Sequence, residues 1–146
     1  MTKIFIGSDH GAFLMKEFLK KELEKKEIKY EDCGCFDESS VDYPDIAKVT
    51  CQKILKNPKN KGILLCGTGI GISISANKIK GIRAALCHNE YTAQMAREHN
   101  DANVLCLGGR VIGFETAKLI LNKFLLSKFL GERHLRRLDK IKQLEC

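Results

Sequence analysis

A cysteine followed by three closely spaced glycines is the part of this sequence that most suggests chemistry. The stretch LLCGTGIGIS, residues 64–73, ends an apolar run at Cys66 and then places Gly67, Gly69 and Gly71 within five residues. Such a loop at the start of a helix presents backbone N–H groups that can hold an anion. The same helix end favours the ionised form of a nearby thiol, so Cys66 is a candidate base or nucleophile. The alternative is a buried cysteine in a tight turn, which is the commoner role of cysteine.

This glycine loop differs from three well-known phosphate-binding loops. A dinucleotide-binding fingerprint requires GxGxxG, whereas the spacing here is GxGxG. A nucleoside-triphosphate loop ends in Gly-Lys-Ser/Thr, which is absent from residues 67–78. A cysteine phosphatase loop carries an arginine shortly after the thiol, but residues 67–77 contain no cation. The sequence therefore predicts an anion site of another kind.

Two histidines and a group of arginines are further candidates. Asp9 and His10 follow the first apolar run, while His99 and Asn100 end a helical pattern. Each has a structural alternative, because Asp9 can cap a helix and His99 can act as a cation at a helix C-terminus. Arginines near the end of the chain can form a basic surface, although guanidinium groups also suit bidentate phosphate binding. These are Arg133, Arg136 and Arg137.

Short apolar runs alternate with helical patterns along the chain, which is typical of an α/β fold. The predicted strands are residues 3–8, 28–33, 61–66, 81–87 and 103–108, and the predicted helices are residues 11–26, 45–56, from 71, 90–98 and 114–128. We expect one three-layer α/β/α domain, residues 1–146, with a five-stranded parallel sheet in the flavodoxin-like order 2-1-3-4-5.

In such sheets, ligands bind at the carboxyl ends of the strands, so the loops that follow the strands are the first candidates for a binding site. The candidate loops contain Asp9 and His10, residues 66–71, His88 and Asn89, and residues 108–110. Residues 34–44 form the longest irregular stretch, either a lid or a connection.

Residues 130–146 predict a C-terminal helical extension. Leu135, Leu138, Ile141 and Leu144 recur at every third position and form a thin apolar stripe. This pattern suits a helix that lies on a neighbouring surface, such as a second subunit. Arg133 and Arg137 share a different face through their i,i+4 spacing.

Composition excludes several classes of protein. The chain has 146 residues, 44% of them hydrophobic, without an apolar run long enough for a bilayer and without an export signal, so we expect a cytoplasmic protein that does not enter a membrane. The net charge of +7 is spread over predicted helix faces, with Glu17/Lys21 and Glu22/Lys26 as i,i+4 pairs. Such charge can raise the local concentration of a small anion, so it favours a phosphorylated metabolite as much as a nucleic acid, and we expect no nucleic-acid partner.

The cysteines other than Cys66 predict no disulfide scaffold and no metal site. Seven cysteines are an odd number, and several lie in apolar runs, so reduced thiols are expected. Cys33 and Cys35 form CxC, and no second pair has zinc-finger spacing. We interpret the remaining thiols as structural: Cys33, Cys35, Cys51, Cys87, Cys106 and Cys146.

Taken together, these motifs resemble the type B ribose-5-phosphate isomerases, a family that also includes the subunits of galactose-6-phosphate isomerase. The matching stretches are SDHGA (8–12), DYP (42–44), CGTGIGISISANK (66–78), GIRAAL (81–86), REHNDANVLCLGGRVIG (97–113) and GERHLRRL (131–138). The resemblance implies an aldose–ketose isomerase of the pentose phosphate pathway that interconverts ribose 5-phosphate and ribulose 5-phosphate without a metal or organic cofactor. Two alternatives stay open: an isomerase of a six-carbon sugar phosphate (allose or galactose 6-phosphate) and a non-catalytic module that binds a phosphorylated metabolite.

The resemblance also implies roles for individual residues. Cys66 matches the base that moves a proton between C2 and C1, and His99 matches the residue that opens the sugar ring. The loop that holds the enediolate oxygens matches Gly67, Thr68, Gly69, Ile70 and Gly71, with the Thr68 hydroxyl contributing. Contacts to sugar and phosphate match Asp9, His10, Asn100, Arg110, Arg133 and Arg137, with Tyr43 nearby. Family members build this pocket between two subunits, so a homodimer or tetramer is expected.

Overall fold

The structure, a computed structural model, describes residues 2–145 and shows the predicted alternation of strands and helices. The strands are β1 (Ile4–Ser8), β2 (Tyr30–Asp32), β3 (Lys61–Cys66), β4 (Ala84–Leu86) and β5 (Val104–Gly108). The helices are α1 (Phe13–Lys25), α2 (Tyr43–Ile54), α3 (Ile70–Asn77), α4 (Glu90–Glu98), α5 (Phe114–Leu126) and α6 (Arg133–Gln143). A short 3-10 helix, η1 (His10–Ala12), precedes α1.

The five strands form a parallel sheet in the order β2-β1-β3-β5-β4. The predicted order 2-1-3-4-5 is therefore wrong for its last two strands. β5 reads VLCLG and all of its residues are buried, whereas the three residues of β4 are only partly buried. A strand covered on both faces needs a continuous apolar run, while an edge strand does not. This difference explains why β5 takes the inner place and β4 the edge.

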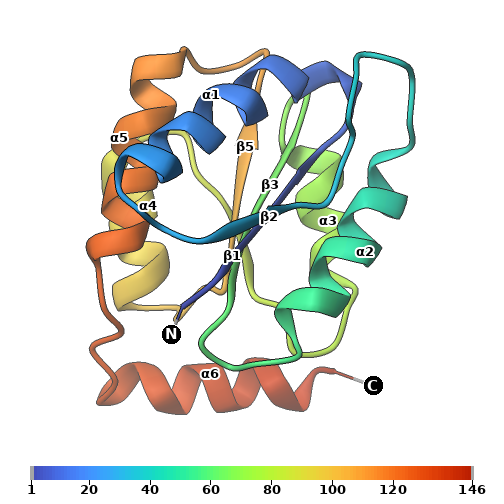
Figure 1. Cartoon of the computed structure of the whole chain (residues 1–146). Helices are drawn as coiled ribbons and strands as arrows, with labels where there is room; N and C mark the ends of the chain where they lie inside the picture. Colours follow the sequence, from blue (N-terminus) through green and yellow to red (C-terminus); the bar gives the residue numbers. More distant parts are fainter. Residues whose placement is uncertain (1, 146) are drawn as a thin grey trace.

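Helices cover both faces of the sheet, which confirms the three-layer α/β/α prediction (Figure 1). α1, α4 and α5 pack on one face, where Leu19 and Phe124 are fully buried. α2 and α3 pack on the other face around Ile54 and Ile72. No helix among residues 2–145 is long and apolar enough to cross a bilayer.

α6 lies across the end of the sheet at which the strands begin, apart from both helical layers (Figure 1). Its apolar stripe is largely uncovered, because Leu135, Ile141 and Leu144 are 52%, 45% and 80% exposed. The carboxylate of Glu145, just after the helix, accepts a hydrogen bond from the Gly81 N–H at 2.5 Å. That the stripe contacts a second subunit remains a prediction.

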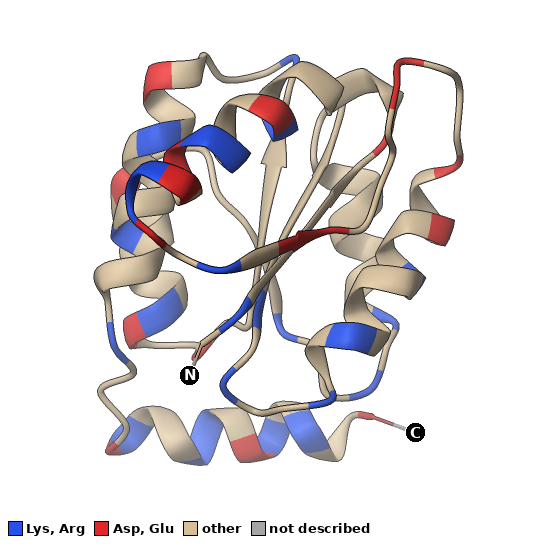
Figure 2. Ribbon diagram, in the orientation of Figure 1, with Lys and Arg blue, Asp and Glu red and all other residues tan. Residues whose placement is uncertain are grey.

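Charged side chains are distributed over the outer faces of the helices, and α6 carries several lysines and arginines (Figure 2). The predicted i,i+4 pairs are not formed. Glu17 binds Lys20, and Glu22 binds Lys25, both at i,i+3 spacing. The i,i+3 neighbour is the alternative partner on a helix surface.

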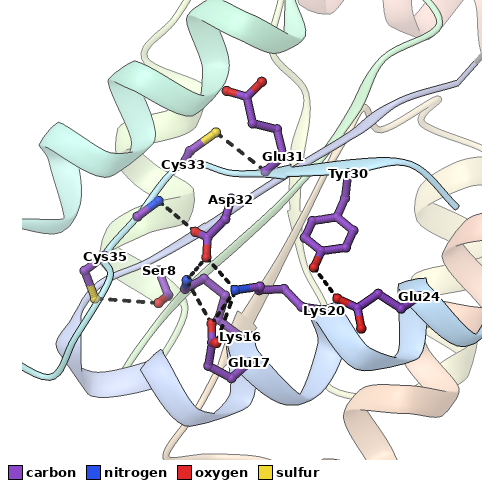
Figure 3. Close-up of polar contacts among 11 residues, drawn as sticks. Ser8, Lys16, Glu17, Lys20, Glu24, Tyr30, Glu31, Asp32, Cys33 and Cys35 are labelled. Carbon is purple, nitrogen blue, oxygen red and sulfur yellow. Dashed lines mark hydrogen bonds and ion pairs between the residues drawn. The ribbon is translucent and has the colours of Figure 1, made fainter.

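One lysine, Lys16, is fully buried and pairs with Asp32 at the end of β2 (Figure 3). Its Nζ lies 2.5 Å from one carboxylate oxygen of Asp32, and Lys20 binds the same oxygen at 2.9 Å. The other oxygen accepts the Gly34 N–H at 2.9 Å. This cluster joins α1 to the segment that leaves β2, and so fixes the start of the long irregular stretch.

The cysteines of the described residues are unpaired, as the sequence predicts. Cys51, Cys87 and Cys106 are buried in the core, where burial raises the pKa of Cys51 to about 12 and that of Cys87 to about 11. Cys35 is also buried, and Cys33 is partly buried. Burial of Cys35, Cys51, Cys87 and Cys106 agrees with their structural interpretation, which stays a prediction for the partly buried Cys33, and Cys146 lies outside the described residues.

Candidate active site

The carboxyl ends of β1, β3 and β5 bring three of the predicted loops together. Ser8 is aligned with Leu65, and Cys66 is aligned with Gly108. The loops are joined directly, because the Gly109 N–H donates to the Cys66 carbonyl at 2.9 Å. The Arg110 N–H likewise donates to the Gly67 carbonyl at 2.9 Å. The sheet therefore places the thiol beside the loops that follow β1 and β5.

The sulfur of Cys66 lies beneath the glycine loop, and the residue is 4% exposed. The Gly69 N–H donates a hydrogen bond to Sγ at 3.1 Å. The loop above the sulfur is open, since Thr68 is exposed and Ile70 is 51% exposed. The Ile70 N–H donates to the Thr68 hydroxyl oxygen at 3.1 Å, which fixes that side chain at the start of α3. One amide of the loop thus serves the thiol itself.

The glycines of this loop leave its backbone amides exposed, and they also allow close packing where a side chain would clash. Gly69 has φ +79°, and a Cβ there would lie 2.8 Å from the Leu107 carbonyl carbon. A Cβ on Gly71 would collide with the ring of Tyr43. Tyr43, the first residue of α2, therefore covers the start of α3 from the side. The sequence suggested the bare amides but not these two contacts.

Asp9 and His10 occupy the neighbouring loop and are held by different partners. A carboxylate oxygen of Asp9 accepts the Gly11 N–H at 2.9 Å and caps η1, which confirms the structural interpretation of this residue. Nδ1 of His10 accepts the Val41 N–H at 3.2 Å. A neutral His10 ring therefore carries its proton on Nε2. The irregular stretch after β2 therefore contacts the loop that carries His10.

His99 and Asn100 lie at the other end of the sheet. His99 caps α4, and Asn100 precedes β5, whose first residue, Val104, is aligned with Gly62. From Gly62 to Cys66 the strand advances roughly 13 Å at about 3.3 Å per residue. In a single chain, His99 is therefore separated from the Cys66 thiol by the full length of β3.

The first turn of α6 joins His99 at this end. The rings of His99 and His134 stack with their centroids 4.2 Å apart and an interplanar angle of 15°. Burial lowers the pKa of His134, and the nearby charges of His99, Arg133 and Arg137 lower it further. This end of the molecule therefore carries two stacked imidazoles and two arginines.

The structure divides the predicted site residues into two groups at opposite ends of the sheet. The Cys66 group, at the carboxyl ends, consists of Asp9, His10, Tyr43, Cys66, Gly67, Thr68, Gly69, Ile70, Gly71 and Arg110. The His99 group, at the amino ends, consists of His99, Asn100, Arg133 and Arg137. Both groups were predicted from the sequence, but their separation was not.

Two further residues beside the His99 group were missed by sequence reasoning, namely Arg83 and Asp101. The Arg83 Nε donates to the carbonyl oxygens of Asn100 and Asp101 at 3.2 and 2.9 Å. The sequence feature that could have identified Arg83 as a candidate is its position within the GIRAAL stretch. Both residues line a cavity of about 320 Å³ at the base of the sheet, together with Lys61 and Arg97.

A second hollow, of about 590 Å³, lies along α4 and α5 between Glu98 and Lys123. Neither hollow is lined by Cys66. Within residues 2–145, no three side chains of His, Cys, Asp or Glu are grouped so that they could hold a metal ion.

Comparison with known proteins places this arrangement in a family. A family model described as Ribose/Galactose Isomerase matches residues 4–141. Ribose-5-phosphate isomerase B of Escherichia coli is 41% identical over 145 residues, which cover 99% of this chain and 97% of that protein.

Solved structures agree. A ribose 5-phosphate isomerase from Thermotoga maritima is 54% identical with a TM-score of 0.95, and the match covers 97% of this chain and 98% of that one. Ribose-5-phosphate isomerase B from Mycoplasma genitalium, solved with bound ribulose-5-phosphate, is 42% identical with a TM-score of 0.93 over 97% of this chain and 95% of that one. The chain therefore belongs to the ribose/galactose isomerase family.

Proposed function

We propose that this protein interconverts ribose 5-phosphate and ribulose 5-phosphate in the cytoplasm, as a step of the pentose phosphate pathway. The observation that carries the proposal is the Cys66 thiol, which lies at the end of β3 with the Gly69 N–H directed at its sulfur. The relative from Mycoplasma genitalium, solved with ribulose-5-phosphate, supports the choice of substrate. No metal or organic cofactor is needed for this chemistry.

The reaction moves one proton between two neighbouring carbons. In the open-chain aldose, the C2 proton is weakly acidic because C1 is a carbonyl carbon. The Cys66 thiolate removes this proton, and the electron pair moves onto the carbonyl oxygen to form an enediolate. The thiol then returns a proton to C1, while a proton moves from the C2 oxygen to the C1 oxygen. The product is the ketose, with Cys66 again a thiolate.

The loop after Cys66 supplies the groups that stabilise the enediolate. The first N–H groups of α3 have no acceptor within the helix; that of Ile70 donates to the Thr68 hydroxyl oxygen, whose own proton can be donated to the substrate. Donors directed at a developing oxyanion are worth about 3–4 kcal/mol each. The Gly69 N–H has a separate role, since it orients the sulfur and stabilises negative charge on it.

The His99 group acts in the site of a second copy of the chain. Ribose 5-phosphate is a closed ring in solution, so its carbonyl must be released by acid–base catalysis before Cys66 can act, and an imidazole suits this role. His99 is too far from Cys66 in its own chain to contact the same sugar. We therefore place His99, Asn100, Arg133 and Arg137 beside the Cys66 group of a partner in a homodimer or tetramer. The uncovered apolar stripe of α6 supplies a surface for that contact.

Hydrogen exchange tests this proposal directly. In deuterated water, we expect the protein to exchange the C2 hydrogen of ribose 5-phosphate and to form ribulose 5-phosphate. Cys66→Ala should abolish both, whereas Cys33→Ala, which removes a thiol outside the Cys66 group, should leave both intact. Exchange that survives in Cys66→Ala would exclude the thiol as the base. Parallel assays with allose 6-phosphate and galactose 6-phosphate decide whether a six-carbon substrate is preferred.

A further inference from the structure

The turn that carries His99 and Asn100 is held by the side chain of Arg83. The Arg83 Nε donates to the carbonyl oxygens of Asn100 and Asp101 at 3.2 and 2.9 Å. The backbone of Arg83 is itself fixed, because its N–H donates to the Asn103 side-chain oxygen at 2.7 Å and its carbonyl accepts the Asn103 N–H at 3.0 Å. Arg83 therefore connects the start of β4 to the turn before β5.

Asp101 completes this connection in an unfavourable backbone conformation. Its φ is +45°, a left-handed value that residues other than glycine seldom adopt. One carboxylate oxygen accepts Arg97 Nη1 at 2.9 Å, and the other lies 3.4 Å from Arg83 Nη2. Such a conformation persists only where the surroundings hold it in place. Two arginines from different elements provide that hold.

Charged side chains surround Asp101 and fix the turn before β5. Arg97 is 7% exposed, and its Nη1 also donates to the Ala102 carbonyl at 2.7 Å. Burial lowers the pKa of Lys61, and the charge of Arg97 lowers it further. Among the described residues that line this cavity, Asp101 is the only acid. Arg83 and Arg97 thus share one carboxylate, which anchors the turn electrostatically.

We propose that Arg83 is a positioning residue for ring opening. By holding the Asn100 and Asp101 carbonyls, it fixes the turn so that His99 presents its imidazole to the sugar in the partner's site. The inference rests on the proposed function, since it assigns Arg83 to the ring-opening step of that reaction. Arg83 itself contacts no reacting atom.

The chemistry of the two substrates separates ring opening from proton transfer. Ribulose 5-phosphate cannot form a five-membered ring, because closure onto its C2 carbonyl requires the C5 oxygen, which carries the phosphate. Exchange of its C1 hydrogen with solvent therefore requires Cys66 but no ring opener. Consumption of ribose 5-phosphate requires both steps.

The test is Arg83→Gln, measured on both substrates at saturating concentrations. We expect turnover of ribose 5-phosphate to fall on the order of 100-fold, the cost of misplacing a catalytic group by about 1 Å. Exchange of the C1 hydrogen of ribulose 5-phosphate in deuterated water should remain unchanged. Lys80→Gln is the matched control: it removes an exposed cation three residues away and should alter neither rate. Arg83→Lys, which keeps the charge and a donor, should recover part of the lost turnover.

Equal losses of both rates in Arg83→Gln, or no loss of either, would overturn the inference. If the glutamine variant fails to fold, the ratio of the two rates in Arg83→Lys decides in the same way. A wild-type protein that performs neither reaction would instead overturn the proposed function. The two failures are distinguishable: if the wild type is active but Arg83→Gln changes both rates equally, only the role of Arg83 is overturned.

Discussion

Cys66 and His99 lie at opposite ends of one parallel sheet, because Cys66 ends β3 and His99 precedes β5. If a working site combines Cys66 of one chain with His99 of another, two inactive variants should complement each other. Mixing Cys66→Ala chains with His99→Ala chains yields hybrid dimers in which one of the two sites is intact. After subunit exchange, we expect about a quarter of the wild-type activity toward ribose 5-phosphate.

A matched mixture provides the control for this complementation. Cys66→Ala and Thr68→Val alter the same group, so every hybrid site retains one defect, and mixing should yield no gain. A site contained in one chain would show no recovery with either mixture.

Arg137 is expected to hold the phosphate of the substrate from α6. Arg137→Glu replaces a charge-assisted hydrogen bond with repulsion, and such bonds are worth about 1.5–3 kcal/mol. The KM for ribose 5-phosphate should therefore rise by on the order of tenfold or more. Lys21→Glu makes the same charge reversal at an exposed position of α1 and should leave KM unchanged. Steady-state kinetics on both variants checks this, and an unaltered KM for Arg137→Glu would remove α6 from the phosphate site.

The contact between Gly71 and Tyr43 predicts a strongly coupled pair. In Gly71→Ala, the new methyl group occupies the space of the Tyr43 ring, which must move away from the start of α3. We expect a loss of about 1–3 kcal/mol in the free energy of unfolding, as for other overpacked sites. Adding Tyr43→Ala should relieve the clash, so the double variant should be more stable than the sum of the two single changes implies. Urea unfolding of the four proteins measures the coupling, and strict additivity would contradict the contact.

Replacing either member of the buried Lys16–Asp32 pair should lower the free energy of unfolding, but by different amounts. Asp32→Asn leaves the buried Lys16 ammonium without its nearest carboxylate and with Glu17, at 3.2 Å, as its remaining partner, which should cost about 3 kcal/mol, the lower end for a broken buried pair. Lys16→Met removes the buried charge and keeps the length of the side chain, so it should cost less. Denaturant midpoints at neutral pH compare the two, and equal losses would show that the second partner of Lys16, Glu17 at 3.2 Å, replaces Asp32.

The same pair predicts how stability depends on acid. Burial tends to raise the pKa of Asp32, but hydrogen bonds from Lys16, Lys20 and the Gly34 N–H lower it further than burial raises it. The folded pKa thus lies below the unfolded value of about 3.9, so the ionised carboxylate stabilises the fold above that pH. This contribution is lost as the pH falls through the folded pKa. Between pH 7 and pH 3, the wild type should therefore lose more stability than Asp32→Asn, and an equal loss would contradict the shift.

The candidate site shows how far local sequence reasoning extends. The glycine loop, the terminal arginines and the two histidine-containing motifs are contiguous stretches, so both groups of site residues could be selected without a structure. Arg83 was not selected, because its partners are carbonyl groups of a turn that lies 17 and 18 residues away along the chain. A motif shows which residues occur together in sequence but not which backbone atoms a long side chain reaches.

By itself, the sequence determined the alternation of strands and helices, the loop that follows Cys66, and the parallel sheet, because each depends on neighbouring residues and on the periodicity of apolar side chains. Only the tertiary structure decided the inner place of β5, the burial of Lys16 against Asp32, and the separation of Cys66 from His99. These depend on how strands align and which faces become covered. These features depend on the packing free energies of segments that are far apart in the sequence, and a local sequence pattern contains no information about them.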